Sequence, residues 1–497
     1  MSEIIQVQKR NEVFLNISCE AGIAYEMQDH FSFFVPGHQH MPLFKMRAWD
    51  GKVRLFNPNK GLLYCGLFEE LKEFCRSREY TLDIHESPTY GLPGELTNVS
   101  PEEIHQFVEN LGLPDSLDRR VYQLEAIYTA IRHQRKVLLS PTGSGKSLII
   151  YAIAEYLLQN ELAQHVLIVV PTTALVHQMV GDFKSYGLPA EESCHKIMGG
   201  YEKNSDKAYF VSTWQSLMKQ PTQWFQKFDA VFIDETHLAK STELTKILEK
   251  TTNTKYRYGL TGSLDNAKTH HMMIQAILGS ITRVAKTRDL IDDGHLSEIS
   301  IDAILLNYSK ETKSLLKGVD YQKEIDFLVS HDRRNKFIRN LALSLEGNTL
   351  LLYSYVDRHG QVLYDMIKER AGDRDVFFVH GGVDAEDREQ VRHITEASNN
   401  AIIVASYGTM STGTNIKRLN NIIAASPTKS VIRVLQSIGR GLRKAHDKDT
   451  FKLYDIADDL SNSKKNKNYT YKHFIERLNI YVNEEFPYKI ITLEIEK

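Results

Sequence analysis

Residues 136–150, KVLLSPTGSGKSLII, have the types and spacing of a phosphate-binding loop. An apolar run, a glycine-rich turn and a second apolar run predict a strand, a loop and a helix in that order. The glycines let the backbone curve around an anion, and the helix N-terminus adds partial positive charge. Lys146 is expected to reach the terminal phosphates, and the Ser147 hydroxyl is expected to hold Mg²⁺. The loop residues predicted to contact the nucleotide are Thr142, Gly143, Ser144, Gly145, Lys146 and Ser147.

Two adjacent carboxylates, Asp234 and Glu235, follow another apolar run, DAVFID. By itself such a pair is usually part of a loop or a helix cap. Downstream of a phosphate-binding loop, the two carboxylates could instead divide the work of nucleotide hydrolysis. Asp234 would bind Mg²⁺, directly or through water, and Glu235 would orient and deprotonate the water that attacks the γ-phosphate.

Alternating strands and helices must position these residues, and the pattern begins near residue 117. It is typical of parallel sheets with helices on both faces, whose ligand loops lie at the carboxyl ends of the strands. A second alternating series begins near Ile299. Strands are predicted at 136–140, 165–171, 208–212, 229–234 and 256–262 in the first series, and at 300–308, 348–354, 375–381, 401–406, 421–427 and 451–457 in the second.

The composition is that of an ordinary globular protein. A chain of 497 residues suggests about three domains, and 42% hydrophobic with 25% charged residues leaves little room for long disordered tails. No apolar run reaches the ~20 residues of a membrane span, and the first residues lack a signal-peptide layout. We therefore expect no membrane association and a cytoplasmic location. The four cysteines form no C-x-x-C pair, so neither a zinc site nor a disulfide framework is indicated.

The N-terminal region is predicted to be a small α/β unit. In KMRAWDGKVRLF, residues 45–56, Asp50-Gly51 indicates a two-residue hairpin turn. Pairing outward from that turn places Met46 and Ala48 on a packed face. The other face then carries several cationic side chains and the indole of Trp49. A basic face of this kind suits a phosphate backbone with a base stacked nearby, although a solvated sheet face is an equal alternative. The residues predicted to contact nucleic acid there are Arg47, Trp49, Lys52 and Arg54.

Several motifs occur in the order found in superfamily 2 helicases and translocases, and the chain resembles that family. They are the loop with Lys146 and Ser147, RVYQ at 120–123, PTTALVHQ at 171–178, STWQSL at 212–217, DETH at 234–237, LTGS at 260–263, YSY at 353–355, HGG at 380–382, ASYGTMSTGTNI at 405–416 and QSIGRGLR at 436–443. The DE-x-H box, the block around RAWDGKVRLF and the compact C-terminal end are most similar to the bacteriophage UvsW-type recombination and repair helicases.

The resemblance implies an α/β fold with two tandem RecA-like parallel-sheet lobes, preceded by a small α/β N-terminal domain. The domains are then expected to be an accessory domain with a DNA contact at 1–95, a linker and bridging helix at 96–116, a first lobe with the ATP site at 117–290, a second lobe with arginine fingers at 291–460 and a C-terminal helical extension at 461–497.

The resemblance also implies roles for individual residues. Arg120 and Gln123 would read adenine, because a carboxamide offers both a donor and an acceptor. Arg440 and Arg443 would act as arginine fingers, with Gln436 near the attacking water, although such arginines are often only solvated. Gly413 and Asn415 would contact the nucleotide, and His237, Thr261 and Ser263 would couple ATP state to lobe motion. The implied nucleic-acid track consists of Thr173, Gln178, Thr213, Gln215, His380 and Thr412.

The implied function is an ATP-dependent and Mg²⁺-dependent DNA helicase or translocase that unwinds or branch-migrates forks, junctions, D-loops or R-loops in recombination, repair and replication. Its expected partners are branched DNA and possible RNA–DNA hybrids, and a monomer is the expected minimal unit. Two alternatives remain open at this point: an ATP-dependent clamp that grips nucleic acid without separating strands, and an RNA-directed helicase.

Overall fold

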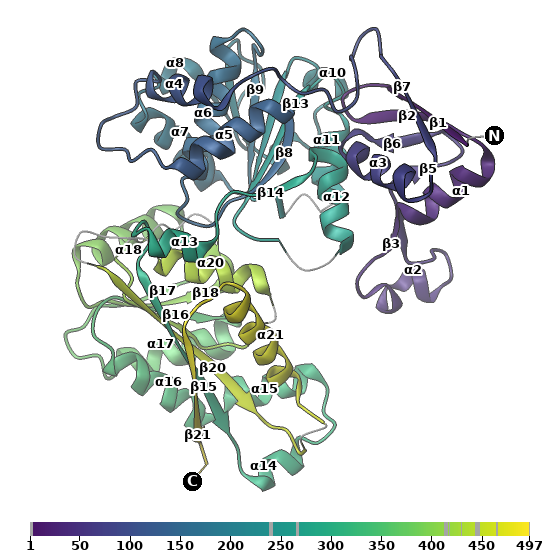
Figure 1. Cartoon of the computed structure of the whole chain (residues 1–497). Helices are drawn as coiled ribbons and strands as arrows, with labels where there is room; N and C mark the ends of the chain where they lie inside the picture. The colour runs from purple at the N-terminus through teal and green to yellow at the C-terminus, as the bar shows by residue number, and fades with distance from the viewer. Residues whose placement is uncertain are drawn as a thin grey trace. The chain divides into compact units, whose positions relative to one another are not determined.

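The computed structural model describes residues 3–237, 242–264, 268–411, 416, 418–428, 430–442, 448–463 and 466–496. These residues form two compact units (Figure 1). The first comprises residues 1–140 and 145–284, and the second comprises residues 285–497 together with the loop residues 141–144. Within the described residues, no helix is long and apolar enough to cross a bilayer.

The N-terminal part of the first unit is a five-stranded mixed sheet with the order β5-β6-β2-β1-β7. Apolar and polar residues alternate along β1 and β2, so one face of each strand is buried. The helix α3 buries Phe68, Leu71 and Phe74. The bounds are β1 Ile4–Lys9, β2 Phe14–Ser18, α1 Ala21–His30, β5 Phe56–Asn57, β6 Leu62–Tyr64, η2 Cys65–Leu67, α3 Phe68–Ser77 and β7 Thr81–His85.

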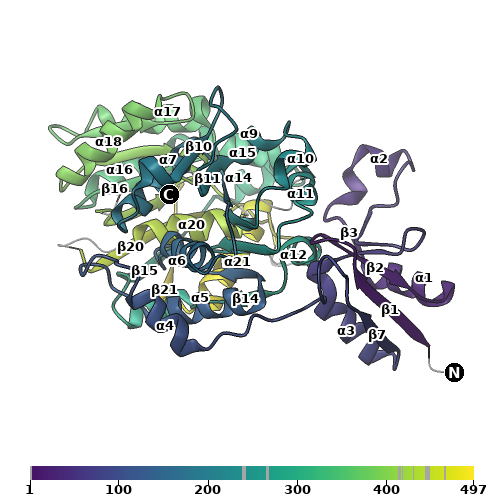
Figure 2. The same ribbon diagram turned by 90° about the horizontal axis from the view of Figure 1, so that it is seen from above.

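The prediction of a hairpin at Asp50-Gly51 is wrong. Strand β4 (Lys52–Arg54) pairs with β3 (Ser32–Phe34) instead, and the intervening chain forms η1 (His38–His40) and α2 (Pro42–Lys45). Proline at the first helical position favours α2, and Arg47 takes a left-handed φ of 56°, which is incompatible with a strand. Met46, predicted to be packed, is 74% exposed. In both ribbon views this segment stands apart from the five-stranded sheet (Figure 2).

A seven-stranded parallel sheet with the order β10-β11-β9-β12-β13-β8-β14 forms the rest of the first unit. The five predicted strands are present, and the short β10 and β14 were not predicted. The strands are β8 Arg135–Leu139, β9 Val166–Val170, β10 Cys194–Ile197, β11 Tyr209–Thr213, β12 Ala230–Asp234, β13 Tyr256–Thr261 and β14 Ile281–Arg283. The helices are α4 Pro101–Glu109, α5 Val121–His133, α6 Lys146–Gln159, α7 Thr173–Ser185, α8 Ala190–Ser193, α9 Trp214–Leu217, α10 Thr222–Phe225, α11 Thr242–Glu249 and α12 Lys268–Leu278.

The N-terminal sheet is packed directly against this parallel sheet, because side chains of both belong to one hydrophobic core. The buried Glu12 carboxylate accepts from Lys9 Nζ at 2.8 Å and from Arg135 Nη2 at 3.1 Å, and the Glu12 amide donates to Thr252 O at 2.8 Å. The Tyr64 hydroxyl also donates to Glu249 at 2.5 Å. Sheet and lobe are therefore joined by buried polar contacts as well as by apolar packing.

A second seven-stranded parallel sheet, β17-β18-β16-β19-β20-β15-β21, organises the second unit. Two parallel-sheet lobes preceded by a small α/β domain are thus confirmed. The strands are β15 Glu298–Asn307, β16 Thr349–Tyr353, β17 Val376–Val379, β18 Ile402–Ser406, β19 Asn421–Ala424, β20 Thr450–Asp459 and β21 Tyr488–Glu494. The helices are α13 Thr287–Asp292, α14 Lys310–Leu315, α15 Tyr321–Ser330, α16 Asp332–Ser344, η4 Val356–Gly360, α17 Gln361–Lys368, α18 Ala385–Ala397, α19 Tyr407–Ser411, α20 Val431–Gly441 and α21 Tyr469–Asn483.

The C-terminal segment is more than the predicted helical extension. After α21 the chain adds β21, which pairs in parallel with β15 and completes the second sheet. The buried Arg477 of α21 holds the helix in place, because its guanidinium donates to both Asp455 carboxylate oxygens at 3.0 and 2.9 Å. The segment is therefore an integral part of the second lobe.

The tight packing of Gly66 gives a test of how firmly the N-terminal sheet is attached. A Cβ at this position would lie 2.0 Å from Gln275 O and 2.6 Å from Ala276 O, both backbone atoms of α12. We expect Gly66→Ala to lower the free energy of unfolding by about 1–3 kcal/mol in urea denaturation. As a control, Gly22→Ala in α1, which meets no atom within 4 Å, should raise it by about 0.5–1 kcal/mol. Equal stability of the two variants would contradict the tight contact.

Candidate active site and nucleic-acid contacts

The phosphate-binding loop has the predicted local structure. It leaves β8 and enters the N-terminus of the helix α6. Gly143 and Gly145 have φ values of 85° and 83°, in the left-handed region that favours glycine. The Ser144 hydroxyl donates to Pro141 O at 2.6 Å and closes the turn. The first N–H groups of a helix have no intrahelical acceptor and the helix N-terminus carries partial positive charge, so the loop fits an anion.

The segment predicted to read adenine begins α5 and lies against this loop. The Gln123 side chain is buried, and a Cβ on Gly145 would be 2.3 Å from its Nε2 atom. Its Oε1 atom accepts from Arg120 N at 3.1 Å, and Arg120 Nη1 donates to the Tyr122 hydroxyl at 2.8 Å. The structure therefore brings Gln123 and the phosphate-binding loop together.

Strand β12 delivers Asp234 and Glu235 to the carboxyl edge of the same sheet. Lys146 Nζ lies 3.4 Å from Glu235 Oε1, so the loop lysine and the carboxylate form an ion pair. Burial raises the pKa of Asp234, and the neighbouring Glu235 raises it further. Burial also acts to raise the pKa of Glu235, but Lys146 and His237 more than offset it, so this pKa lies below its ordinary value. Lys146 and His237 thus stabilise the ionised form of the Glu235 carboxylate.

The backbone at Glu235 adopts a left-handed conformation, with φ at 54°. Non-glycine residues in this region carry a conformational cost, and they occur preferentially at functional sites. The Glu235 amide donates to Asp234 Oδ1 at 3.0 Å, which supports the turn. The unusual backbone therefore coincides with the residue proposed to act on the attacking water.

A hydrogen-bonded cluster joins Glu235 to the loop after β13. His237 Nδ1 lies 3.0 Å from Thr261 Oγ1 and 3.3 Å from Glu235 Oε2. Thr261 Oγ1 lies 3.4 Å from Glu235 Oε2 and donates to Ser263 O at 3.0 Å. The predicted coupling residues thus lie together, and Ser263 contributes its carbonyl to the Thr261 contact. We name His237, Thr261 and Glu235 the carboxylate cluster.

The oxygen donors at this edge suit Mg²⁺, which prefers hard oxygen ligands and takes only one or two from the protein. Ser147 and Asp234 are the side chains that would hold the ion, whose chemistry there would be to neutralise charge on the phosphates. The Ser147 hydroxyl is placed 3.0 Å from the Tyr186 hydroxyl, which sequence reasoning missed because nothing in the local pattern marks Tyr186. Among the described residues no group of three or more His, Cys, Asp or Glu side chains could form a separate metal site.

The predicted nucleic-acid residues of the first lobe lie at or just after the carboxyl ends of β9 and β11. Thr173 is the first residue of α7 and Gln178 is exposed on it. Thr213 precedes α9, with Oγ1 3.0 Å from Ser216 Oγ, and Gln215 is exposed in that helix. All four therefore lie near one edge of the first sheet, with Thr172 rather than Thr173 capping α7.

In the second lobe, His380 follows β17, and its Nδ1 atom accepts from Gly382 N at 3.1 Å. Gln436 and Arg440 belong to α20, but their side chains lie outside the described part. The remaining predicted residues, Thr412, Gly413, Asn415 and Arg443, also lie outside the described residues.

The basic N-terminal residues are arranged differently from the predicted hairpin face. Arg47 is exposed, whereas Arg54 forms an ion pair with Asp50. Trp49 is half-buried, and its indole Nε1 donates to Lys52 O at 2.9 Å. The four residues remain close in the chain, but they do not form one continuous face of a two-stranded sheet.

Comparison with known proteins extends over the whole chain. Family models match at residues 5–85 (DNA helicase UvsW, N-terminal), 116–266 (type III restriction enzyme, res subunit) and 333–445 (helicase conserved C-terminal domain). The ATP-dependent DNA helicase uvsW of Enterobacteria phage T4 is 35% identical over 507 residues, covering 99% of this chain and 100% of the relative. The chain belongs to the UvsW family of superfamily 2 helicases.

Other similarities agree with the UvsW assignment. The crystal structure of T4 UvsW aligns over 100% of both chains, with 33% identity and a TM-score of 0.52. The DNA 3′-5′ translocase XPB2 of Sulfurisphaera tokodaii is 26% identical over 45% of this chain and 48% of its own. The resemblance inferred from the motifs is therefore confirmed, and the chain is an ATP-hydrolysing helicase that binds ATP and DNA.

If the carboxylate cluster couples ATP hydrolysis to movement along DNA, a change in the cluster should reduce unwinding more than ATP hydrolysis in this UvsW-family chain. Thr261→Val keeps the side-chain shape but removes the hydroxyl that contacts His237 and Glu235. We expect DNA-stimulated ATP hydrolysis to stay within a few-fold of the parent, while base pairs opened per ATP fall about tenfold. Parallel ATPase and strand-displacement assays measure the ratio, with Thr252→Val as control, because the half-buried Thr252 hydroxyl donates to Gln226 and not to the cluster. An unchanged ratio would contradict a coupling role for Thr261.

Proposed function

We propose that this chain is an ATP-driven motor that unwinds or branch-migrates branched DNA, such as forks, junctions, D-loops or R-loops, in recombination, repair and replication. The observation that carries the proposal is similarity over 99% of the chain to a relative named as an ATP-dependent DNA helicase, including the UvsW-type N-terminal domain. That domain shares one hydrophobic core with the first lobe, so a DNA arm bound to it would move with the lobe.

The proposal assigns the ATP site to residues of both lobes. Lys146 and the loop residues 142–147 hold the phosphates, Gln123 reads the base, and Asp234 with Ser147 holds Mg²⁺. Glu235 orients and activates the attacking water, because its ionised carboxylate lies 3.4 Å from Lys146 Nζ, the group proposed to hold the terminal phosphate. Arg440, Arg443 and Gln436 are proposed to complete the site, with Gly413 and Asn415 as further nucleotide contacts.

The proposed track for the translocated strand follows the strand ends of both sheets. Its residues are Thr173, Gln178, Thr213, Gln215, His380 and Thr412. Opening one base-pair step costs ~1.4 kcal/mol on average, so the hydrolysis of one ATP can drive strand separation. We further propose a cytoplasmic monomer as the minimal unit, with RNA–DNA hybrids as a possible second substrate.

Strand displacement on matched substrates tests the proposal. The full chain should unwind forked and four-way DNA with ATP and Mg²⁺, and Lys146→Ala should reduce both ATP hydrolysis and unwinding to background, because the phosphates lose their only loop cation. ATP turnover on DNA without strand separation would instead indicate a clamp. Unwinding of RNA duplexes in preference to DNA branches would indicate an RNA-directed helicase, and either result would overturn the proposal.

The cations Arg47, which is exposed, and Lys52, which is half-buried, are proposed to contact a DNA arm. Because Arg54 is neutralised by Asp50, the sharper test is Arg47→Glu combined with Lys52→Glu. We expect affinity for branched DNA to fall about tenfold, and the dependence of log Kd on log salt to become shallower. Arg76→Glu combined with Lys72→Glu in α3, two cations paired with Glu73 and Glu69, is the control with the same change in charge. Equal effects of the test and control variants would favour a solvated face without DNA contact.

A further inference from the structure

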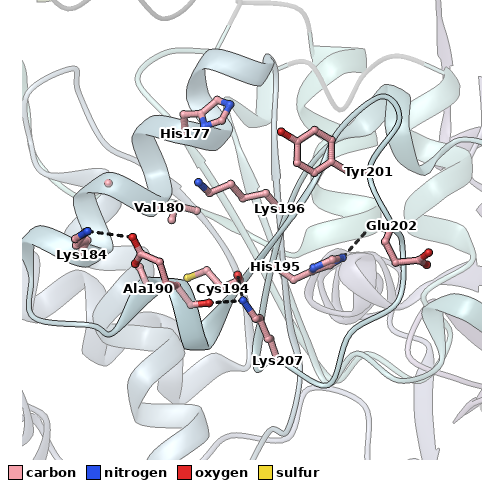
Figure 3. Close-up of a pocket in the computed structure, with 12 residues that line it drawn as sticks. His177, Val180, Lys184, Ala190, Cys194, His195, Lys196, Tyr201, Glu202 and Lys207 are labelled. Atoms are coloured by element: carbon pink, nitrogen blue, oxygen red, sulfur yellow. Dashed lines mark hydrogen bonds and ion pairs between the residues drawn. The ribbon is translucent and has the colours of Figure 1, made fainter.

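A cavity of about 440 Å³ lies in the first lobe between α7, α8, β10 and the loop that follows β10 (Figure 3). None of its lining residues is assigned above to the nucleotide or to DNA. The lining is rich in groups that bind anions, and its histidines and lysines are His177, Lys184, His195, Lys196 and Lys207.

Three of these groups are already engaged by neighbouring residues. Lys184 Nζ forms an ion pair with Glu191 at 3.0 Å, and Lys207 donates to Cys194 O at 3.2 Å. His195 Nε2 contacts Glu202 O at 2.9 Å. These contacts occupy the hydrogen-bonding groups of Lys184, His195 and Lys207, so these three residues are part of the cavity wall.

Lys196 and His177 differ from those three groups, because neither has an ion pair or side-chain hydrogen bond in the part of the chain that the structure describes. Tyr201 completes the set and is 52% exposed. In Figure 3 the Tyr201 hydroxyl points toward the His177 ring, and the Lys196 side chain extends with its amine toward α7. A cation, an imidazole and an exposed aromatic ring, from β10, α7 and the loop after β10, thus line the same cavity. We name them the α7–β10 triad.

The cavity does not fit a covalent or metal site. Its single thiol, Cys194, is buried, and burial raises the pKa of that thiol to about 12, so it stays protonated and unreactive. The cavity is open beside Gly181 of α7, where an added Cβ would have no neighbouring atom within 4 Å. The space is therefore accessible to a chain that passes along the surface of α7.

We propose that the α7–β10 triad binds one nucleotide unit of a DNA strand, outside the family motifs. Lys196 and His177 hold a backbone phosphate, and the ring of Tyr201 stacks on the adjoining base. This inference rests on the proposed function in that DNA is the substrate, and it adds a contact that lengthens the strand path beyond Thr173 and Gln178 along α7.

A simpler role exists for Lys196 alone, since a lysine on an edge strand discourages pairing with another sheet, and β10 is an edge strand. That role makes no use of the ring of Tyr201 or of His177. The two accounts therefore differ in whether all three side chains affect DNA affinity.

Salt-dependent binding of the full chain to a fluorescent oligothymidylate strand tests the proposal. Lys196→Gln should weaken binding and make the slope of log Kd against log salt shallower by about 0.7, the value for one single-strand phosphate. Tyr201→Ala should weaken binding about tenfold through lost stacking, whereas Tyr201→Phe should bind like the parent. Lys310→Gln, an exposed lysine of the second lobe, is the charge control.

ATP hydrolysis separates a binding role from a folding defect. With Lys196→Gln or His177→Gln, the DNA concentration for half-maximal ATPase stimulation should rise, while the rate at saturating DNA stays unchanged. Unchanged affinity and slope would overturn the triad, as would a lowered maximal rate at unchanged half-saturation. Because a plain single strand is used, the result is readable even if branched DNA proves not to be the substrate.

Discussion

A charged carboxylate in a mostly buried position is the constraint on which the catalytic side of the first lobe depends. Burial alone would favour the protonated form of Glu235, and Lys146 and His237 reverse that preference. The loop lysine therefore has a partner before any nucleotide arrives, and phosphates entering the loop must compete for it. The Thr261 hydroxyl contacts both His237 and the Glu235 carboxylate. A change in the charge of Glu235 therefore alters the hydrogen bonds of Thr261, at the end of β13.

Paired buried charges also stabilise the attachment of the N-terminal domain to the first lobe. Glu12 is satisfied by Lys9 and Arg135, and removing any one partner would leave a buried charge uncompensated. Nearby, the buried Arg257 donates to backbone oxygens, Leu248 O and Ile277 O, in the last turns of α11 and α12. Burial lowers the pKa of Arg257 to about 9, and it still carries charge at neutral pH. These contacts fix α12, on which Gly66 rests.

The sequence predicted what local patterns determine: the strand, loop and helix around Lys146, the strand before Asp234 and both parallel sheets. It failed where the outcome depends on tertiary pairing. Asp50-Gly51 carries a strong turn signal, yet Phe33 pairs with Val53 because the helix starting at Pro42 removes the nearer strand. Strand β10 has four residues, too few for a period to show. The α7–β10 triad consists of residues from separate elements, so no continuous sequence motif predicts it.

The position of β15 has a consequence for the order in which the chain is made. Its neighbours in the sheet are β20 and β21, with Glu298 opposite Thr450 and Ile301 opposite Tyr488. At a synthesis rate of roughly 5–20 residues per second, β15 leaves the ribosome on the order of 10 s or more before either neighbour exists. During that interval an apolar strand has both edges unpaired, which is a template for aggregation. The second lobe should therefore be the part of the nascent protein that most needs chaperone protection.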